Sequence, residues 1–505
     1  MGCIPESYED ALNSDDNVIH ESEYFEATKQ QAQQLIAEQD TIKALTRHHM
    51  GIGAGARVMI DFEKCTIGNF NICFPLTIKH SDAPPLKLYF RCAMPHKLGE
   101  LRSAGAVDEK MRCEVATYAW MQQNCSDIRI PYLYGFGLTD HRQFTHDSHR
   151  PLLARVMQFF RRIVYTWLRP SAVLSRYVSH TSRHRLSTAY MLLEDVSSDG
   201  SKALVDTWSL YGDDPQRRQN FYRGLSRTIL SLARVPQHRI GAFRFHDDGT
   251  LTLSNRPLTT NVAILENDGA PCCVPRDRTY ATTEAYVSDM LSFHKARLTT
   301  NPNPALDAAD CRSMMASQVG FQAVSNQYIL PDRREGPFFL QFDDISICNI
   351  FVDDDWNIRS LVDLEWINAQ PLEMMRVPHW LVDGDLADFE GGLLERFEQR
   401  RRQFIEVFRE EECRAAPTQD PILTNMMNWS WEHGGSWFWI GLTSVNAIHA
   451  MFSGHICPQG TLSYEEESTL SQFWCPNSEE FVERKELDIQ AYRKKLYDWY
   501  NRDKQ

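Results

Sequence analysis

The stretch from Phe338 to Trp366 constrains the fold more than any other part of this 505-residue chain. Its letters predict an apolar strand, FFLQF, then a polar loop, then two short strands, NIFV and NIRSLVDL, joined by the turn DDDW. Asp344 and Asn349 are five residues apart on the loop, and Asp363 stands at the end of the last strand. A hairpin can bring these carboxylates and this amide together. Such a set of oxygen ligands suits a metal-bound phosphate chain.

The composition predicts a globular protein with a large core. A chain of this length that is 43% hydrophobic and 24% charged can form two lobes or domains. Its net charge of −14 argues against nucleic acid as the main partner and favours a cationic small molecule. The thirteen cysteines form no CxxC pair, which is typical of reduced thiols in a cytoplasmic protein. The acidic start lacks a secretory signal, and the apolar window 437–452 is too short to predict a membrane span.

The first half of the chain reads as β-rich. Strands are predicted at 57–60, 70–78, 86–91, 130–135 and 190–195, and one helix is predicted at 107–123. Gly68 and Asn69 form a turn that either lies over phosphates or only supplies the positive φ of a hairpin. Residues 139–187 have an irregular pattern around an apolar, helix-like patch at 152–168 and are interpreted as an insertion. The strand 190–195 is expected at the sheet edge, as a connector to a second lobe.

A cation and an acid in this half are candidate partners. Period-two alternation places Lys87, Tyr89 and Arg91 on one face of their strand. Glu114, on the helix 107–123, could reach back and hold a cation there. A solvent-exposed glutamate is the alternative interpretation.

The second half reads as helical, with one embedded hairpin. Its predicted helices are 215–234, 281–300, 306–326, 389–408, 422–431, 437–452 and 479–500. We therefore expect an α+β fold and the following units: an N-terminal helical extension at 1–50 with a helix at 24–45, a β-rich lobe at 51–198, a helical lobe at 199–478 and a C-terminal helix at 479–505.

The order of these parts resembles the aminoglycoside phosphotransferase family in the form abundant in filamentous fungi. The similar segments are GNFNICFPLTI, LKLYFRCAMP, EKMRCEVATYAW, IRIPYLYGFG, YMLLEDV, IGAFRFHDDGTLTLSNRPL and DDISICNIFVDDDWNIRSLVDLEW. The resemblance runs from about residue 55 to about residue 455. It implies a protein-kinase-like fold of two lobes, ATP and Mg²⁺ as cofactors, and transfer of the γ-phosphoryl group to a small-molecule hydroxyl.

The resemblance also assigns roles to single residues. Asp344 matches the aspartate that takes or orients the proton of the substrate hydroxyl, and Asn349 and Asp363 match the metal ligands. Arg91 matches the strand cation that holds the α- and β-phosphates, and Glu114 matches its helix partner.

The remaining assignments concern the nucleotide. The turn at Gly68 and Asn69 would steady the phosphates through its amides. Leu193 and Glu194 belong to the strand that leads into the linker contacting adenine.

The catalytic loop departs from the family pattern at three positions. Phe342 and Ser346 stand where the family has histidines, and Ile347 stands where it has proline. These changes favour an alternative function, a catalytically impaired protein that binds nucleotide or acts as a scaffold. Lys87 remains a rival to Arg91 as the phosphate-binding cation.

Two further sets of acidic residues are weaker candidates for binding a metal or the acceptor. Glu365 could support a second metal, whereas the run 353–355 is typical of a solvated turn. Asp383, Asp385, Asp388 and Glu390 could form an acidic wall for an amine acceptor, although solvated loops commonly carry such clusters.

Overall fold

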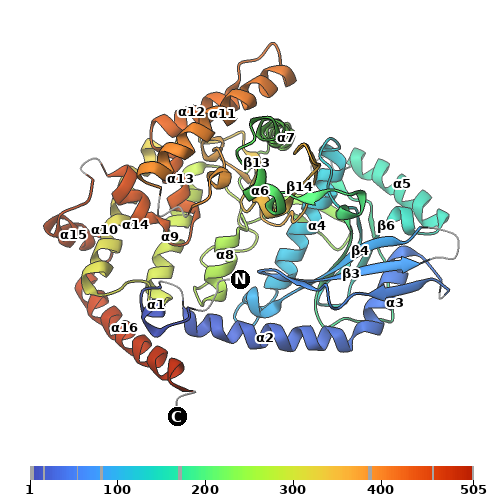
Figure 1. Ribbon diagram of the computed structural model, residues 1–505, viewed down its shortest axis with the longest axis horizontal. Coiled ribbons are helices and arrows are strands. Elements are labelled where there is room, and N and C mark those ends of the chain that lie inside the picture. Colours follow the sequence, from blue (N-terminus) through green and yellow to red (C-terminus); the bar gives the residue numbers. More distant parts are fainter. Residues whose placement is uncertain are drawn as a thin grey trace.

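A computed structural model describes residues 5–14, 17–53, 55–79, 84–168, 173–384, 389–457 and 460–502. Its architecture is mixed α and β with antiparallel pairing throughout the described sheets, in agreement with the predicted α+β class. An eight-stranded sheet dominates the first half (Figure 1). Its strands follow the order β1 (Arg57–Ile60), β3 (Asn71–Lys79), β4 (Leu86–Ala93), β9 (Tyr190–Glu194), β5 (Leu133–Gly137), β6 (Gln143–His146) and β8 (Tyr177–Ser179), and β2 (Thr66–Ile67) pairs with β3.

Helices cover both faces of this sheet. The helices α2 (Val18–Ala37) and α3 (Gln39–Met50) contribute Leu35, Ile42 and Leu45 to a core with one face of the sheet. That face includes Leu88 and Phe90 of β4. Helix α4 (Ala106–Asn124) belongs to the main core, which extends from the other face into the helical half. Because neighbouring side chains alternate along a strand, Arg91 is directed toward α4.

The second half is mainly helical, and Figure 1 shows these helices beside the large sheet. Its helices are α6 (Val205–Tyr211), α7 (Pro215–Ala233), α8 (Thr260–Asn267), α9 (Thr283–Thr300), α10 (Ala308–Val324), α11 (Gly391–Ala415), α12 (Ile422–Glu432), α13 (Gly435–Thr443), α14 (Ala447–Met451), α15 (Tyr464–Ser471) and α16 (Ser478–Tyr500). Three small sheets accompany them: β10 (Lys202–Ala203) with β14 (Ile350–Val352) and β15 (Ile358–Leu361), β11 (Ala242–Phe245) with β12 (Thr250–Asn255) and β7 (Val173–Leu174), and β13 (Phe339–Phe342) with β16 (Ile367–Gln370).

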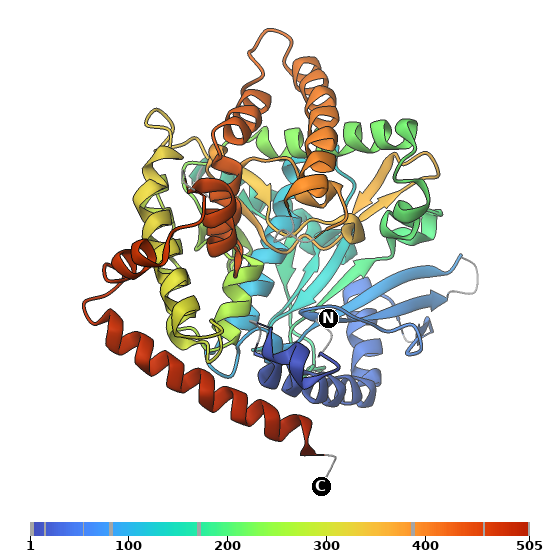
Figure 2. The same ribbon diagram turned by 60° about the vertical axis from the view of Figure 1, so that its left-hand side comes forward.

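The two ends of the chain pack together. Helix α16 runs along the outside of the helical half and reaches α1 (Tyr8–Leu12), as Figures 1 and 2 show. The backbone N–H of Val18 donates to the hydroxyl of Tyr492 over 3.0 Å. The proposed boundaries at residues 50, 198 and 478 remain predictions.

The large sheet is wider than the sequence indicated. The strand β9 was expected at an edge, but it is an interior strand that pairs with β4 on one side and β5 on the other. The stretch 139–187 supplies the reason, because β6 and β8 form in it and extend the sheet beyond β5. The helix-like patch predicted at 152–168 is confirmed as α5 (Leu152–Leu168), but the remainder of the stretch is more regular than expected.

Two predicted helices are each divided in the structure. The single helix expected at 24–45 is α2 followed by α3, which meet at Glu38. There the carboxylate of Glu38 accepts hydrogen bonds from the N–H and hydroxyl of Ser187, both over 3.1 Å. The helix expected at 437–452 is α13 followed by α14. The contact of Glu38 with the distant Ser187 cannot be predicted from the local sequence.

Across the described ranges, each helix is too short or too polar to cross a bilayer.

Candidate functional site

A buried ion-pair cluster joins the large sheet, helix α4 and the segment after β15. Arg91 donates from Nη1 to Glu114 Oε1 over 2.8 Å, and its Nη2 lies 3.1 Å from Glu365 Oε2. The same Nη2 also donates to Asp363. The expected contact between the strand cation and Glu114 is therefore confirmed. Lys87, the rival cation, is exposed on the same strand.

Lys110 is a second cation in the cluster, and sequence reasoning missed it. Its Nζ donates to Glu114 Oε2 over 2.8 Å and to Asn71 Oδ1 over 3.0 Å, and it also pairs with Glu365. Its side chain is only 2% exposed. Lys110 precedes Glu114 by four residues, so the two share one face of α4. This spacing was the signal that could have identified it.

The cluster carries an excess of negative charge. Two cations, Arg91 and Lys110, face three carboxylates, which leaves one net negative charge. Burial raises the pKa of Asp363 to about 6, with help from Glu365, although Arg91 opposes the shift. Burial also opposes ionisation of Glu365, but Lys110 and Arg91 hold its pKa below the usual range. Within this cluster the pKa of Asp363 is thus raised while the pKa of Glu365 is lowered.

The backbone around Asp363 adopts an uncommon conformation. Asp363 and Trp366 have φ values of +60° and +68°, a left-handed region that residues other than glycine rarely occupy. Such conformations cost roughly 1–3 kcal/mol and concentrate at functional sites. In the same segment, the N–H of Val362 donates to the carbonyl of Asn349 over 2.9 Å. This bond brings the loop residue Asn349 beside Asp363, as the hairpin geometry predicted.

Asp344 lies on the loop after β13 and is exposed. Its carboxylate accepts a hydrogen bond from the hydroxyl of Thr260, at the start of α8, over 3.1 Å. Desolvation by the surrounding protein raises the pKa of Asp344, and the nearby charge of Glu365 adds to the shift. On the same loop, Ser346 donates its hydroxyl hydrogen to Asn349 Oδ1 over 2.8 Å. The structure thus places Asp344, Asn349 and Asp363 around one region.

Phe342, the last residue of β13, and Ile347, in the segment that follows, both have apolar contacts. Phe342 and Ile347 are partly buried and pack against the main core. Between Phe342 and Asp344 stands Asp343, which the sequence did not single out. Burial raises the pKa of Asp343 to about 7, and Asp344 adds to the shift while Arg376 opposes it.

A cavity of about 220 Å³ opens beside Asp344. Its walls come from α7, β13, the loop after β13 and the segment after β16, and they are mostly apolar. The lining side chains are Leu225, Ile229, Leu232, Leu340, Gln341, Phe342, Asp343, Asp344, Ile345, Ser346, Gln370, Met374, Met375, Arg376, Pro378, His379 and Trp380. The cavity can therefore hold a small molecule with an apolar body next to the Asp344 carboxylate.

The glycine turn lies close to the cluster. Gly68 donates its N–H to the carbonyl of Asn71 over 2.9 Å, and both Gly68 and Asn69 are exposed. Asn71 itself contacts Lys110 and Glu365. Gly68 does not have a positive φ, so the turn does not need glycine for its backbone conformation.

The strand expected to lead to the adenine site, β9, pairs with a neighbouring strand on each side. Leu193 lies opposite Tyr89 of β4 and is two residues along β9 from Met191, the partner of Arg91. The N–H of Glu194 donates to the carbonyl of Tyr132 over 3.0 Å. The Glu194 carboxylate accepts from Arg129 Nη1 over 2.9 Å. The contact of Leu193 and Glu194 with adenine remains a prediction.

The other acidic groups are outside the cluster. Asp353 accepts the N–H groups of Asp355 and Asn357 over 3.1 Å and 2.9 Å, so it stabilises the hairpin turn. Of the acidic wall, Asp383 and Glu390 are exposed. Asp385 and Asp388 lie outside the described residues.

Comparisons of the chain with known protein families and with curated proteins found no match.

Proposed function

We propose that this protein is a phosphotransferase that moves the γ-phosphoryl group of ATP to a hydroxyl of a small molecule. The proposal includes a two-lobed fold similar to that of aminoglycoside phosphotransferases. The observation that carries it is the buried cluster, in which the strand cation Arg91 contacts both Glu114 of α4 and Asp363 of the loop segment. These residues are far apart in the chain, and each has a distinct role in phosphoryl transfer.

Asp344 would act on the acceptor. Its carboxylate would orient the acceptor hydroxyl and take its proton, while the acceptor oxygen bonds to the γ-phosphorus and ADP departs. A raised pKa makes the carboxylate a better proton acceptor than an ordinary aspartate. Thr260 would fix the orientation of Asp344 through its hydrogen bond.

Asn349 and Asp363 would hold Mg²⁺, with Glu365 beside them. The carboxylate oxygens of Glu114, Asp363 and Glu365 lie within 4.8 Å of one another, and Mg²⁺ prefers oxygen ligands. The Asp363 side chain is 37% exposed and can be reached from solvent. Mg²⁺ bound there would neutralise charge on the phosphate chain. Arg91 would supply the matching positive charge from the sheet.

The acceptor would occupy the cavity beside Asp344. Its apolar walls favour a hydroxylated molecule with an apolar or aromatic body, and Asp343 offers a partner for a cationic group. An acceptor bound in this cavity would present a hydroxyl directly to Asp344.

A screen for ATP turnover against hydroxylated amines, sugars and aromatic alcohols tests this function. We expect Asp344→Asn to lose activity by a factor of at least about 10². The matched control is Asp355→Asn, because Asp355 is an exposed aspartate at the tip of the β14–β15 hairpin. Equal activity of wild type and Asp344→Asn would remove Asp344 from the mechanism.

Two contacts favour a second candidate function, a nucleotide-binding or scaffold module without catalysis. Arg91 already pairs with Asp363, and Ser346 already donates to the Asn349 side chain. A thermal-shift measurement with Mg·ATP separates the candidates when it is combined with the turnover assay. Ligand at a hundredfold excess over its Kd stabilises the folded state by about 2.7 kcal/mol. A shift without turnover would support the module, and the absence of a shift would contradict both candidates.

A further inference from the structure

Helix α5 presents an apolar face to solvent. Its side chains there are large, and the most exposed are Trp167 at 84% and Leu153 at 77%. With about 100° of rotation per residue, the exposed apolar positions of α5 fall within about 160° of arc. They are Leu152, Leu153, Val156, Met157, Phe159, Phe160, Ile163, Val164 and Trp167. An exposed apolar surface of this kind marks an interaction site.

The opposite face of α5, which contacts the rest of the protein, is polar. Gln158 is 2% exposed and donates from Nε2 to the carbonyl of Ser175 over 2.9 Å. Arg161 donates to Gln158 Oε1 and to the carbonyl of Asp248, each over 3.3 Å. A surface helix ordinarily turns its apolar stripe inward and its polar stripe outward. These hydrogen bonds hold α5 in the reverse orientation, with its apolar face available to a partner.

The chain around α5 carries concentrated positive charge. Between Ser148 and Leu193 the sequence has eight arginines and neither aspartate nor glutamate, although the whole protein has a net charge of −14. Arg155 is exposed at one flank of the apolar face, and Arg161 lies at the other. A partner that matches this surface must therefore have an apolar region bordered by negatively charged groups.

We propose that α5 binds the surface of an anionic lipid bilayer and lies parallel to the membrane plane. Aromatic and aliphatic side chains such as Phe160 and Trp167 would enter the boundary between headgroups and acyl chains, and the arginines would contact anionic headgroups. The helix has 17 residues and contains three arginines, so it lies on a bilayer rather than crosses it. A second copy of the chain is a poorer partner, because pairing two such surfaces would place like charges together.

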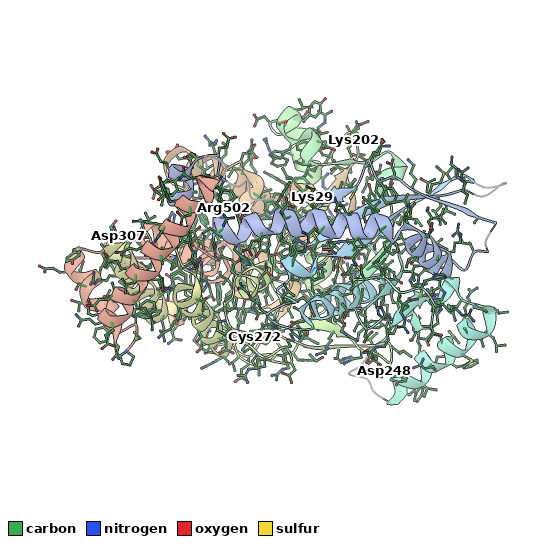
Figure 3. All side chains as sticks on the ribbon, turned by 90° about the horizontal axis from the view of Figure 1, so that it is seen from below. Lys29, Lys202, Asp248, Cys272, Asp307 and Arg502 are labelled. Carbon is green, nitrogen blue, oxygen red and sulfur yellow. The ribbon has the colours of Figure 1, made fainter. Side chains whose placement is uncertain are left out.

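The position of α5 suits this role. It lies at the periphery of the large sheet in Figure 1, and in Figure 3 it lies at the edge of the molecule beside Asp248. Lys202, which pairs with Asp354 of the β14–β15 hairpin, is on the opposite side of the view in Figure 3. A bilayer against α5 would therefore leave the hairpin side uncovered.

Flotation of the full-length protein with phosphatidylcholine vesicles, with and without phosphatidylserine, tests the proposal. We expect wild type to float with the anionic vesicles, and added salt to reduce the bound fraction because it screens the arginines. Phe160→Glu combined with Trp167→Glu should lower vesicle binding at least about tenfold. Replacement of Arg155 by glutamine should lower it about fivefold and only on anionic vesicles.

Leu101→Glu is the matched control, because Leu101 is 93% exposed and lies outside α5. It should float as wild type does, and all variants should keep the wild-type circular dichroism spectrum. Three results would overturn the proposal: no flotation of wild type, equal flotation of the Phe160 and Trp167 double variant, or no preference for anionic vesicles. Light scattering that shows a dimer dispersed by this double variant, without vesicle binding, would assign the face to a second copy instead.

Discussion

Replacing Lys110 with methionine should strongly destabilise the protein. The methionine keeps much of the apolar stem but removes the charge that contacts Glu114 and Glu365. The net charge of the cluster would change from −1 to −2 in a region where both partner carboxylates are at most 7% exposed. Loss of one partner from a buried ion pair costs about 3–5 kcal/mol, because the remaining charge stays buried without compensation. We expect a loss of this size in the free energy of unfolding.

Urea unfolding, followed by circular dichroism, measures this loss. The matched control is Lys202→Met, which removes a lysine that pairs with Asp354 over 2.9 Å but with side chains 56% and 85% exposed. Because solvent screens this exposed pair, its loss should change the free energy of unfolding far less than the loss of Lys110 does. Adding Glu365→Gln to the Lys110 variant returns the net charge to −1 and should recover about 1–3 kcal/mol. Equal losses for the two lysine variants, or no recovery in the double variant, would refute the reasoning.

Three further predictions concern pH, the phosphate cation and the metal. Because burial raises the pKa of Asp343 from 3.8 to about 7, only the unfolded chain loses this proton between those values. The free energy of unfolding should thus fall by up to about 1.4 kcal/mol per pH unit as pH rises through this window. Urea unfolding at several pH values should show that this free energy depends less on pH in Asp343→Asn than in wild type. The same pH dependence in both proteins would contradict the assignment of the raised pKa to Asp343. Arg91→Met should weaken Mg·ATP binding in calorimetry at least about tenfold, whereas Lys87→Met, at the exposed end of the same strand, should not; the opposite order would make Lys87 the phosphate cation. Chelation of divalent cations should lower phosphoryl transfer at least about a hundredfold, and Asp363→Asn should show a comparable loss; full activity after chelation would exclude the proposed metal.

Much of the fold could be read from local patterns. The strand β4 and the helix α4 follow their sequence periodicity closely. The width of the large sheet could not be predicted, because β6 and β8 are short strands and the pairing of β8 with β6 joins segments on either side of α5. The break between α2 and α3 at Glu38 could not be predicted either, because Glu38 contacts Ser187, which is distant in the chain.

The candidate site was predictable where spacing alone determines position. Alternation along β4 correctly directs Arg91 toward α4, and the hairpin brings Asn349 beside Asp363. Lys110 was missed because a lysine in a helix is ordinarily solvated, and only its tertiary contacts show that it is buried. The positive φ of Asp363 could not be predicted either, because aspartate adopts this conformation more often than most residues but still uncommonly.

The most direct test of the proposed function is ³¹P NMR of the wild-type protein with ATP, Mg²⁺ and an acceptor found in the screen. We predict that ADP and a new phosphomonoester of the acceptor will appear in equal amounts, and that Asp344→Asn will produce neither at a comparable rate. Formation of ADP with inorganic phosphate alone, or the same phosphomonoester from Asp344→Asn, would contradict transfer of the γ-phosphoryl group through Asp344.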